Sequence, residues 1–155
     1  MKSMIKAAIA TTILGVATIS STFAAETQKP TVVLVHGAFS DGSAWSKVIP
    51  LLQDKGVNVV AVQNPLSSLS DDVKAAQRVL DMQKGPVVLV GHSWGGVPVT
   101  QVGQQDKVKA LVYVAAFAPS EGQSVVDVSK DYPTPSGFSH LVADKDGFVT
   151  LSLEG

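Results

Sequence analysis

The feature that most constrains this chain is an apolar run that leads directly into a glycine-rich turn around a serine. The run is Val87–Val90, and the turn after it reads Gly91-His92-Ser93-Trp94-Gly95-Gly96. Five of these residues fit the pattern G-x-S-x-G, the nucleophile elbow, which holds a serine on a sharp turn between a strand and a helix. Side chains at either flanking glycine would collide with the turn. The pattern therefore predicts a strand, a strained elbow at Ser93 and a helix, with an ordinary glycine-rich turn as the alternative.

A second motif lies upstream, where the apolar run Thr31–Val35 is followed by His36-Gly37-Ala38. The tetrahedral oxyanion of acyl transfer needs two backbone N–H donors. In elbow proteins one donor belongs to the residue after the serine, here Trp94, and the other to a loop after an earlier strand. The N–H of Ala38 is the candidate for that second donor. His-Gly alone is typical of a plain turn, but together with the elbow it favours an oxyanion hole.

These two blocks resemble the α/β-hydrolase superfamily, and within it the branch of small esterases and hydroxynitrile-lyase-like proteins. Three further segments resemble the same branch, namely Trp45, Leu51-Leu52 and the run from Leu111 to Pro119. The resemblance extends from about Thr31 to the end of the chain. It is specific in the elbow and oxyanion blocks and loose after Pro119.

The resemblance implies an α/β-hydrolase fold, with a mostly parallel sheet and helices on both faces. It implies a serine hydrolase that acts on small carboxylic esters without a cofactor or a metal. Ser93 would be the nucleophile, and the backbone N–H groups of Ala38 and Trp94 would form the oxyanion hole. The supporting positions would be His36, Gly37, Gly91, His92, Gly95 and Gly96. His36 and His92 are expected to be structural rather than catalytic.

Strand-like and helix-like segments alternate along the chain. Strands are expected at 31–35, 57–62, 87–90 and 108–115, and helices at 44–55, after a cap at Ser70, and from Ser93 to about Gln105. Gly56 is expected to end the first helix. Asp71 and Asp72 suit the positive end of the second helix dipole. Continuous apolar strands in such an alternation predict a parallel sheet buried by helices on both faces.

Composition excludes several other classes of protein. The chain has 155 residues, 45% of them hydrophobic, with a formal net charge of −1, three histidines and no cysteine. These values suit one globular domain and give no electrostatic case for binding nucleic acid. Zinc-type spacing of cysteine and histidine is absent from the sequence, and so is a glycine-rich phosphate loop.

Residues 1–24 have the pattern of a signal peptide. Lys2 and Lys6 precede an uncharged apolar stretch over 7–19, and Thr22-Phe23-Ala24 places small residues at the −3 and −1 positions. Cleavage after Ala24 would export the protein to the periplasm or the medium without a stable membrane anchor. An uncleaved anchor is the alternative, but the stretch is short for a membrane span.

A serine hydrolase also needs a general base and an acid, which follow the serine in the order Asp or Glu, then His. His140 is the one histidine after Ser93, and Asp127, Asp131 or Asp144 could orient it. That region, 120–155, resembles the start of a cap over the domain. We therefore expect the base and the acid beyond residue 155, with 25–155 as the N-terminal part of the domain.

Two other functions remain open. The chain could be an inactive remnant or a binding module that lacks the catalytic Asp and His. A hydroxynitrile lyase ranks below the esterase, because such lyases use a side-chain hydroxyl in the first oxyanion loop, where this chain has Gly37. Strands that the chain lacks would cover Leu111, Val112 and Val114, so we expect these side chains to be exposed. The oligomeric state stays open.

Overall fold

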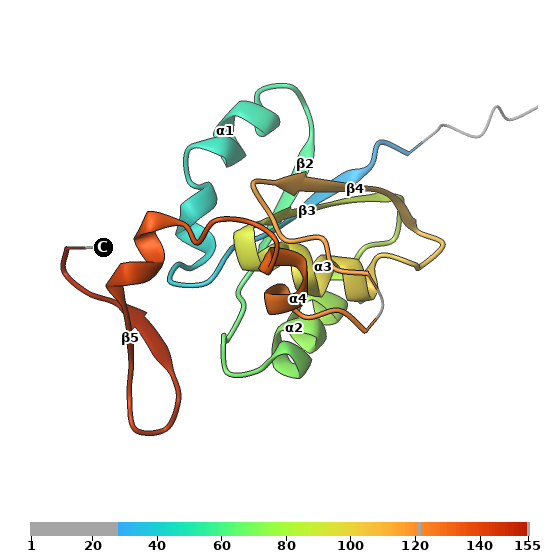
Figure 1. The fold of residues 1–155 in the computed structure, drawn as a ribbon. Coiled ribbons are helices and arrows are strands. Elements are labelled where there is room, and N and C mark those ends of the chain that lie inside the picture. The colour runs from blue at the N-terminus through green and yellow to red at the C-terminus, as the bar shows by residue number, and fades with distance from the viewer. Residues whose placement is uncertain (1–27, 121, 155) are drawn as a thin grey trace, which may run out of the picture.

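Four apolar runs pair side by side as one parallel sheet. The computed structural model describes residues 28–120 and 122–154, so the expected signal peptide lies outside the described residues. The strand order is β2-β1-β3-β4 (Figure 1). The strands are β1 (Thr31–Val35), β2 (Asn58–Val62), β3 (Val87–His92) and β4 (Val108–Val114). All three pairings are parallel, which confirms the predicted sheet.

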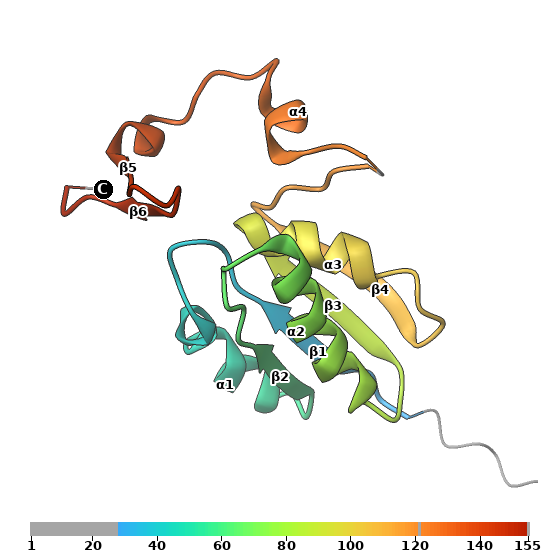
Figure 2. The same ribbon diagram turned by 90° about the horizontal axis from the view of Figure 1, so that it is seen from below.

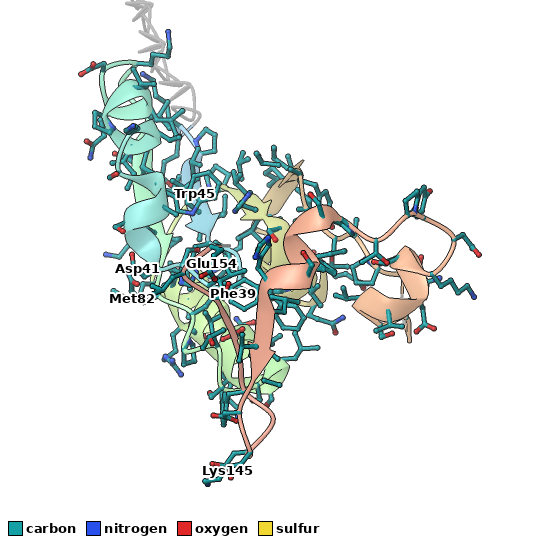
Figure 3. The ribbon with its side chains drawn as sticks, turned by 60° about the vertical axis from the view of Figure 1, so that its left-hand side comes forward. Phe39, Asp41, Trp45, Met82, Lys145 and Glu154 are labelled. Carbon is teal, nitrogen blue, oxygen red and sulfur yellow. The ribbon has the colours of Figure 1, made fainter. Side chains whose placement is uncertain are left out.

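Helices cover the two faces of the sheet, as Figure 2 shows. On one face lie α2 (Leu69–Asp81) and α3 (Gly96–Val102), and on the other lie the short 3-10 helix η1 (Gly42–Trp45) and α1 (Val48–Gln53). Successive strand residues face opposite sides of a sheet. Val33 accordingly packs with Leu80 of α2, whereas Leu34 packs with Trp45 of η1. Trp45 is labelled in Figure 3.

The helix expected over 44–55 is instead two short helices, η1 and α1. Pro50 explains the break, because a continuous helix would place this proline in its interior, where it removes a backbone hydrogen bond. In the observed arrangement Pro50 lies in the first turn of α1, where the N–H groups have no partner within the helix. Gly56 follows α1 with φ 70°, a conformation that suits glycine after a helix, as expected.

The cap of α2 is Ser68, so the expectation of Ser70 is wrong. Ser68 is extended and its hydroxyl accepts the backbone N–H of Asp71 at 3.1 Å, whereas Ser70 is already helical. The hydroxyl of Ser68 also lowers the pKa of Asp71 by donating to its carboxylate. The helix after the elbow ends at Val102 rather than near Gln105.

The outer edge of the sheet carries exposed apolar side chains on β4. Val112 and Val114 are 41% and 43% exposed, as expected, whereas Leu111 is partly covered by the core under α2 and α3. The exposure expected for this strand is therefore confirmed at Val112 and Val114 and is wrong at Leu111.

Much of the chain after β4 lies beyond the carboxyl ends of the strands (Figure 2). It contains α4 (Val125–Ser129), η3 (Ser136–His140) and an antiparallel hairpin of β5 (Leu141–Ala143) and β6 (Val149–Leu151). Lys145 lies at the tip of this hairpin (Figure 3). Among the described residues, no helix combines the length and apolar character needed to cross a membrane.

Replacing Ser68 by Ala should lower the free energy of unfolding by about 1 kcal/mol, because the N–H of Asp71 loses its acceptor. Ser70→Ala should change it by less than about 0.5 kcal/mol, since Ser70 is exposed and makes no cap. Urea unfolding of both variants measures the difference. Equal losses would contradict the assignment of the cap.

Candidate active site

Ser93 stands at the turn between a strand and a helix, in the order that the glycine pattern predicts. Strand β3 ends at His92, Ser93 opens the short 3-10 helix η2 (Ser93–Gly95), and α3 follows at once. The φ angle of Ser93 is 51°, in the left-handed region that residues other than glycine rarely adopt. Its side chain is half-buried. The backbone is thus strained at the one residue that the pattern selects.

The glycines around Ser93 are required by close contacts between backbones. A Cβ atom added to Gly91 would lie 2.7 Å from the carbonyl oxygen of Gly95. One added to Gly95 would lie 2.7 Å from the carbonyl oxygen of His36, which follows β1. Such distances are too short for any side chain. The elbow can therefore approach the end of β1 only because these positions lack one.

The loop after β1 lies directly against the serine. A Cβ atom added to Gly37 would lie 2.8 Å from the Cβ of Ser93. The next residue, Ala38, and the residue after the serine, Trp94, line one cavity of about 520 Å³. Ser93 is not part of that lining. The structure brings together the loop, the serine and Trp94, which the proposed oxyanion hole requires.

His36 holds the loop in place from inside the protein. It is buried, and its Nε2 accepts the backbone N–H of Asn64 at 2.9 Å. The other ring nitrogen, Nδ1, therefore carries the proton and donates to the carbonyl oxygen of Gly37 at 2.8 Å. The side-chain amide of Asn64 donates to the carbonyl oxygen of His36 at 3.0 Å. These bonds give His36 a structural role between the ends of β1 and β2.

His92 also packs within the structure. Its ring meets the ring of Trp45 edge to face, with 6.2 Å between centroids and 85° between planes. Aromatic rings favour this arrangement. The contact links the end of β3 to η1.

Within residues 28–120 and 122–154 the Ser93 hydroxyl makes no hydrogen bond to a histidine or a carboxylate. His140 ends η3 and is half-buried. Asp127 caps α4 through Ser124, whose hydroxyl lowers the pKa of that carboxyl group, and Asp144 accepts the N–H of Phe148 in the hairpin turn. Neither carboxylate is hydrogen-bonded to His140. The same ranges hold no group of three histidine or acidic residues placed to bind a metal ion.

Asp72 is the residue of the site that sequence reasoning missed. It is fully buried, and its Oδ2 accepts the indole N–H of Trp94 at 2.7 Å while its Oδ1 accepts the backbone N–H of Leu66 at 2.8 Å. The sequence interpretation gave it only a favourable position at the start of a helix. A signal was present, because Asp72 lies on the same helix face as the buried residues Ala76 and Leu80.

The sequence matches the model of the Alpha/beta hydrolase family over residues 32–151. That match covers most of the chain, and the fold and the elbow agree with it. The chain therefore belongs to the α/β-hydrolase family.

Two relatives from Arabidopsis thaliana illustrate the similarity. The chain is 32% identical to methylesterase 2 over 132 residues, which are 73% of this chain and 50% of the relative. It is 31% identical to an alpha-hydroxynitrile lyase over 139 residues, which are 78% of this chain and 54% of the relative. The chain thus spans about half the length of these curated relatives.

A solved structure shows the same fold. The crystal structure of a pyrethroid hydrolase from Sphingobium faniae superposes with a TM-score of 0.66 at 20% sequence identity. The superposition covers 83% of this chain and 58% of the hydrolase.

Gly95→Ala should destabilise the fold by about 3 kcal/mol, because the new methyl group would press on backbone oxygens that cannot move aside. Gly95 has φ −56°, a conformation that alanine adopts without strain. The loss of stability therefore reports only the collision of the new methyl group. Gly137→Ala is the matched control, since nothing lies within 4 Å of its added Cβ. Thermal melts compare the two variants, and equal midpoints would contradict the close approach.

Proposed function

We propose that this protein is a serine hydrolase that cleaves small carboxylic esters. The observation that carries the proposal is Ser93, held on a left-handed elbow with the glycine of the loop after β1 against its Cβ. Membership of the α/β-hydrolase family and the similarity to a methylesterase support it.

In the proposed reaction the Oγ of Ser93 attacks the carbonyl carbon of the ester. The carbonyl oxygen becomes an oxyanion that accepts the backbone N–H groups of Ala38 and Trp94. Collapse of this intermediate breaks the bond to the alcohol oxygen, which leaves as the alcohol after taking a proton. Water then attacks the acyl-serine, and the carboxylic acid leaves. Each step moves a proton, so a base must act at Ser93 Oγ.

We propose that the base and its orienting acid lie in a segment that corresponds to the part of the relatives outside the matched region. The described residues that could have served are His140 with Asp127, Asp131 or Asp144, and none of them makes a hydrogen bond with Ser93. Asp127 and Asp144 are held in other contacts. The segment from 120 onwards would act as the start of a cap, because residues 146–149 of its hairpin line the cavity that Ala38 and Trp94 also line. A volume of about 520 Å³ suits a small ligand.

An inactive binding module is the second candidate. It is favoured by the absence of a hydrogen bond between Ser93 and any base within residues 28–120 and 122–154. A lyase ranks lower, although one relative is an alpha-hydroxynitrile lyase, because Gly37 carries no hydroxyl. A fluorophosphonate probe separates the first two candidates, since it labels only a serine that a base activates.

Export is part of the proposal. The pattern of residues 1–24 predicts a signal peptide cleaved after Ala24, which would place the hydrolase in the periplasm or the medium.

Ser93→Ala should abolish hydrolysis of p-nitrophenyl acetate by the protein expressed from its complete reading frame, because no acyl-serine can form. The loss should reach at least about 1000-fold in kcat. Ser70→Ala, an exposed serine on α2, should leave the rate unchanged. Activity that survives Ser93→Ala, or its absence from the unsubstituted protein, would overturn the proposed function.

The exported protein should begin at Ala25. Mass spectrometry of the intact protein from the periplasm and the medium measures its N-terminus. A mass that includes Met1 would refute cleavage, and Lys6→Glu should reduce export because it weakens the positive start of the signal.

A further inference from the structure

Asp72 places a carboxylate inside the protein between two parts of the candidate site. Both oxygens are used, Oδ2 by the indole N–H of Trp94 at 2.7 Å and Oδ1 by the backbone N–H of Leu66 at 2.8 Å. The side chain is fully buried. Hydrogen bonds to a charged acceptor are stronger than neutral ones, and burial removes the competition from water.

The two donors belong to walls of the same cavity. Leu66 lies in the loop between β2 and α2 at φ 56°, a conformation that a leucine rarely adopts without support. Leu66 and Trp94 line this cavity together with Ala38 and the hairpin residues 146–149. One carboxylate therefore fixes the strained loop and the elbow side chain relative to each other.

Trp94 also carries one of the two proposed oxyanion donors, its backbone N–H. Anchoring the indole ring fixes the side-chain torsions of Trp94 and thereby restrains its backbone N–H. Donors that stabilise an oxyanion must be placed before the reaction, because reorienting them during it costs free energy. A small displacement of such a group is enough to slow a reaction.

We propose that Asp72 is a positioning residue of the ester-cleaving reaction and that it acts through the indole of Trp94. This inference rests on the proposed function and deepens it. Asp72 borders the same cavity, but its side chain is fully buried and both its oxygens are already bonded, so we assign its effect to Trp94. It orients Trp94, so that the backbone N–H of Trp94 points at the developing oxyanion and the indole forms a fixed wall of the cavity.

Asp72→Asn tests the contact with little change in shape. An amide has one accepting oxygen, so either Trp94 or Leu66 loses its acceptor and faces an N–H₂ group instead. Asp71→Asn is the matched control, because it removes the same charge from the first turn of the same helix. Asp71 is bonded to Ser67, Ser68 and Lys74 instead of Trp94.

The first measurement is the ¹H–¹⁵N spectrum of the indole groups, which does not depend on activity. The chain has two tryptophans, and the Nε1 of Trp45 has no hydrogen-bond partner among the described residues. Trp94→Phe assigns the two signals. Asp72→Asn should shift the Trp94 signal and speed its exchange with solvent, whereas the Trp45 signal should stay in place. Asp71→Asn should move neither signal.

The second measurement is the kinetics of p-nitrophenyl acetate hydrolysis by the protein expressed from its complete reading frame. Asp72→Asn should lower kcat by about 10- to 100-fold, because a misplaced donor acts on the transition state, and KM should change by less than about threefold. In a Trp94→Phe background, Asp72→Asn should lower kcat by less than about twofold further, because the group through which it acts is gone.

Three results would overturn the inference. The first is an Asp72→Asn variant with a shifted indole signal and an unchanged kcat, which would leave Asp72 a purely structural role. The second is an equal loss of kcat in the two backgrounds. The third is an Asp71→Asn variant that loses as much kcat as Asp72→Asn. If Asp72→Asn does not fold, or if it leaves the Trp94 signal in place, Trp94→Phe breaks the same bond from the other side, and an unchanged kcat would then refute the inference.

Failure of the proposed function gives a different result. If the unsubstituted protein hydrolyses no ester, the proposed function is refuted, and so is the role of Asp72 in that reaction. The indole signals would still report the hydrogen bond between Trp94 and Asp72. Loss of activity on Ser93→Ala, together with full kcat in an Asp72→Asn variant whose Trp94 signal has shifted, would instead sustain the function and refute the positioning role.

Discussion

The contact on which the candidate site depends is the approach of two backbones at the carboxyl edge of the sheet. Strands β1 and β3 are neighbours in the sheet, so their ends meet although more than fifty residues separate them in the chain. A side chain at Gly95 would collide with the carbonyl oxygens of Val35 and His36. The glycine removes that obstacle. The helix after the elbow can then start directly over the end of β1, and Ser93 comes to lie against Gly37.

Close packing of backbones leaves polar groups inside the protein, and each needs a partner. Three buried side chains meet this need around the site, His36, Asn64 and Asp72. His36 and Asn64 join the loops after β1 and β2 through reciprocal hydrogen bonds. Asp72 joins that same loop after β2 to the elbow after β3. The loops after β1, β2 and β3 are therefore tied by polar contacts, which have stricter geometry than apolar packing.

The sequence predicted those parts of the fold that local patterns determine. Apolar runs identified all four strands, and the spacing of glycines around Ser93 identified the turn before any contact was known. Helix starts were less certain, because Ser68 and Ser70 are both plausible caps and only the backbone conformation decides between them. The helix face that Asp72 shares with Ala76 and Leu80 could have indicated its burial, but not its partner, since Trp94 is 22 residues away and sequence patterns carry no information about such pairings.

Strand type and burial are separate properties, and β4 shows why. Its sequence is largely apolar and would suit cover on both faces in a sheet with strands on either side. In the sheet β4 has one neighbouring strand, and Val112 and Val114 remain more than two-fifths exposed. Burying one such valine contributes about 1.5–3 kcal/mol, a large share of the ~5–15 kcal/mol by which domains are stable. The apolar pattern of a strand thus indicates which of its side chains would be stabilised by burial. Its position in the strand order decides which of them are buried.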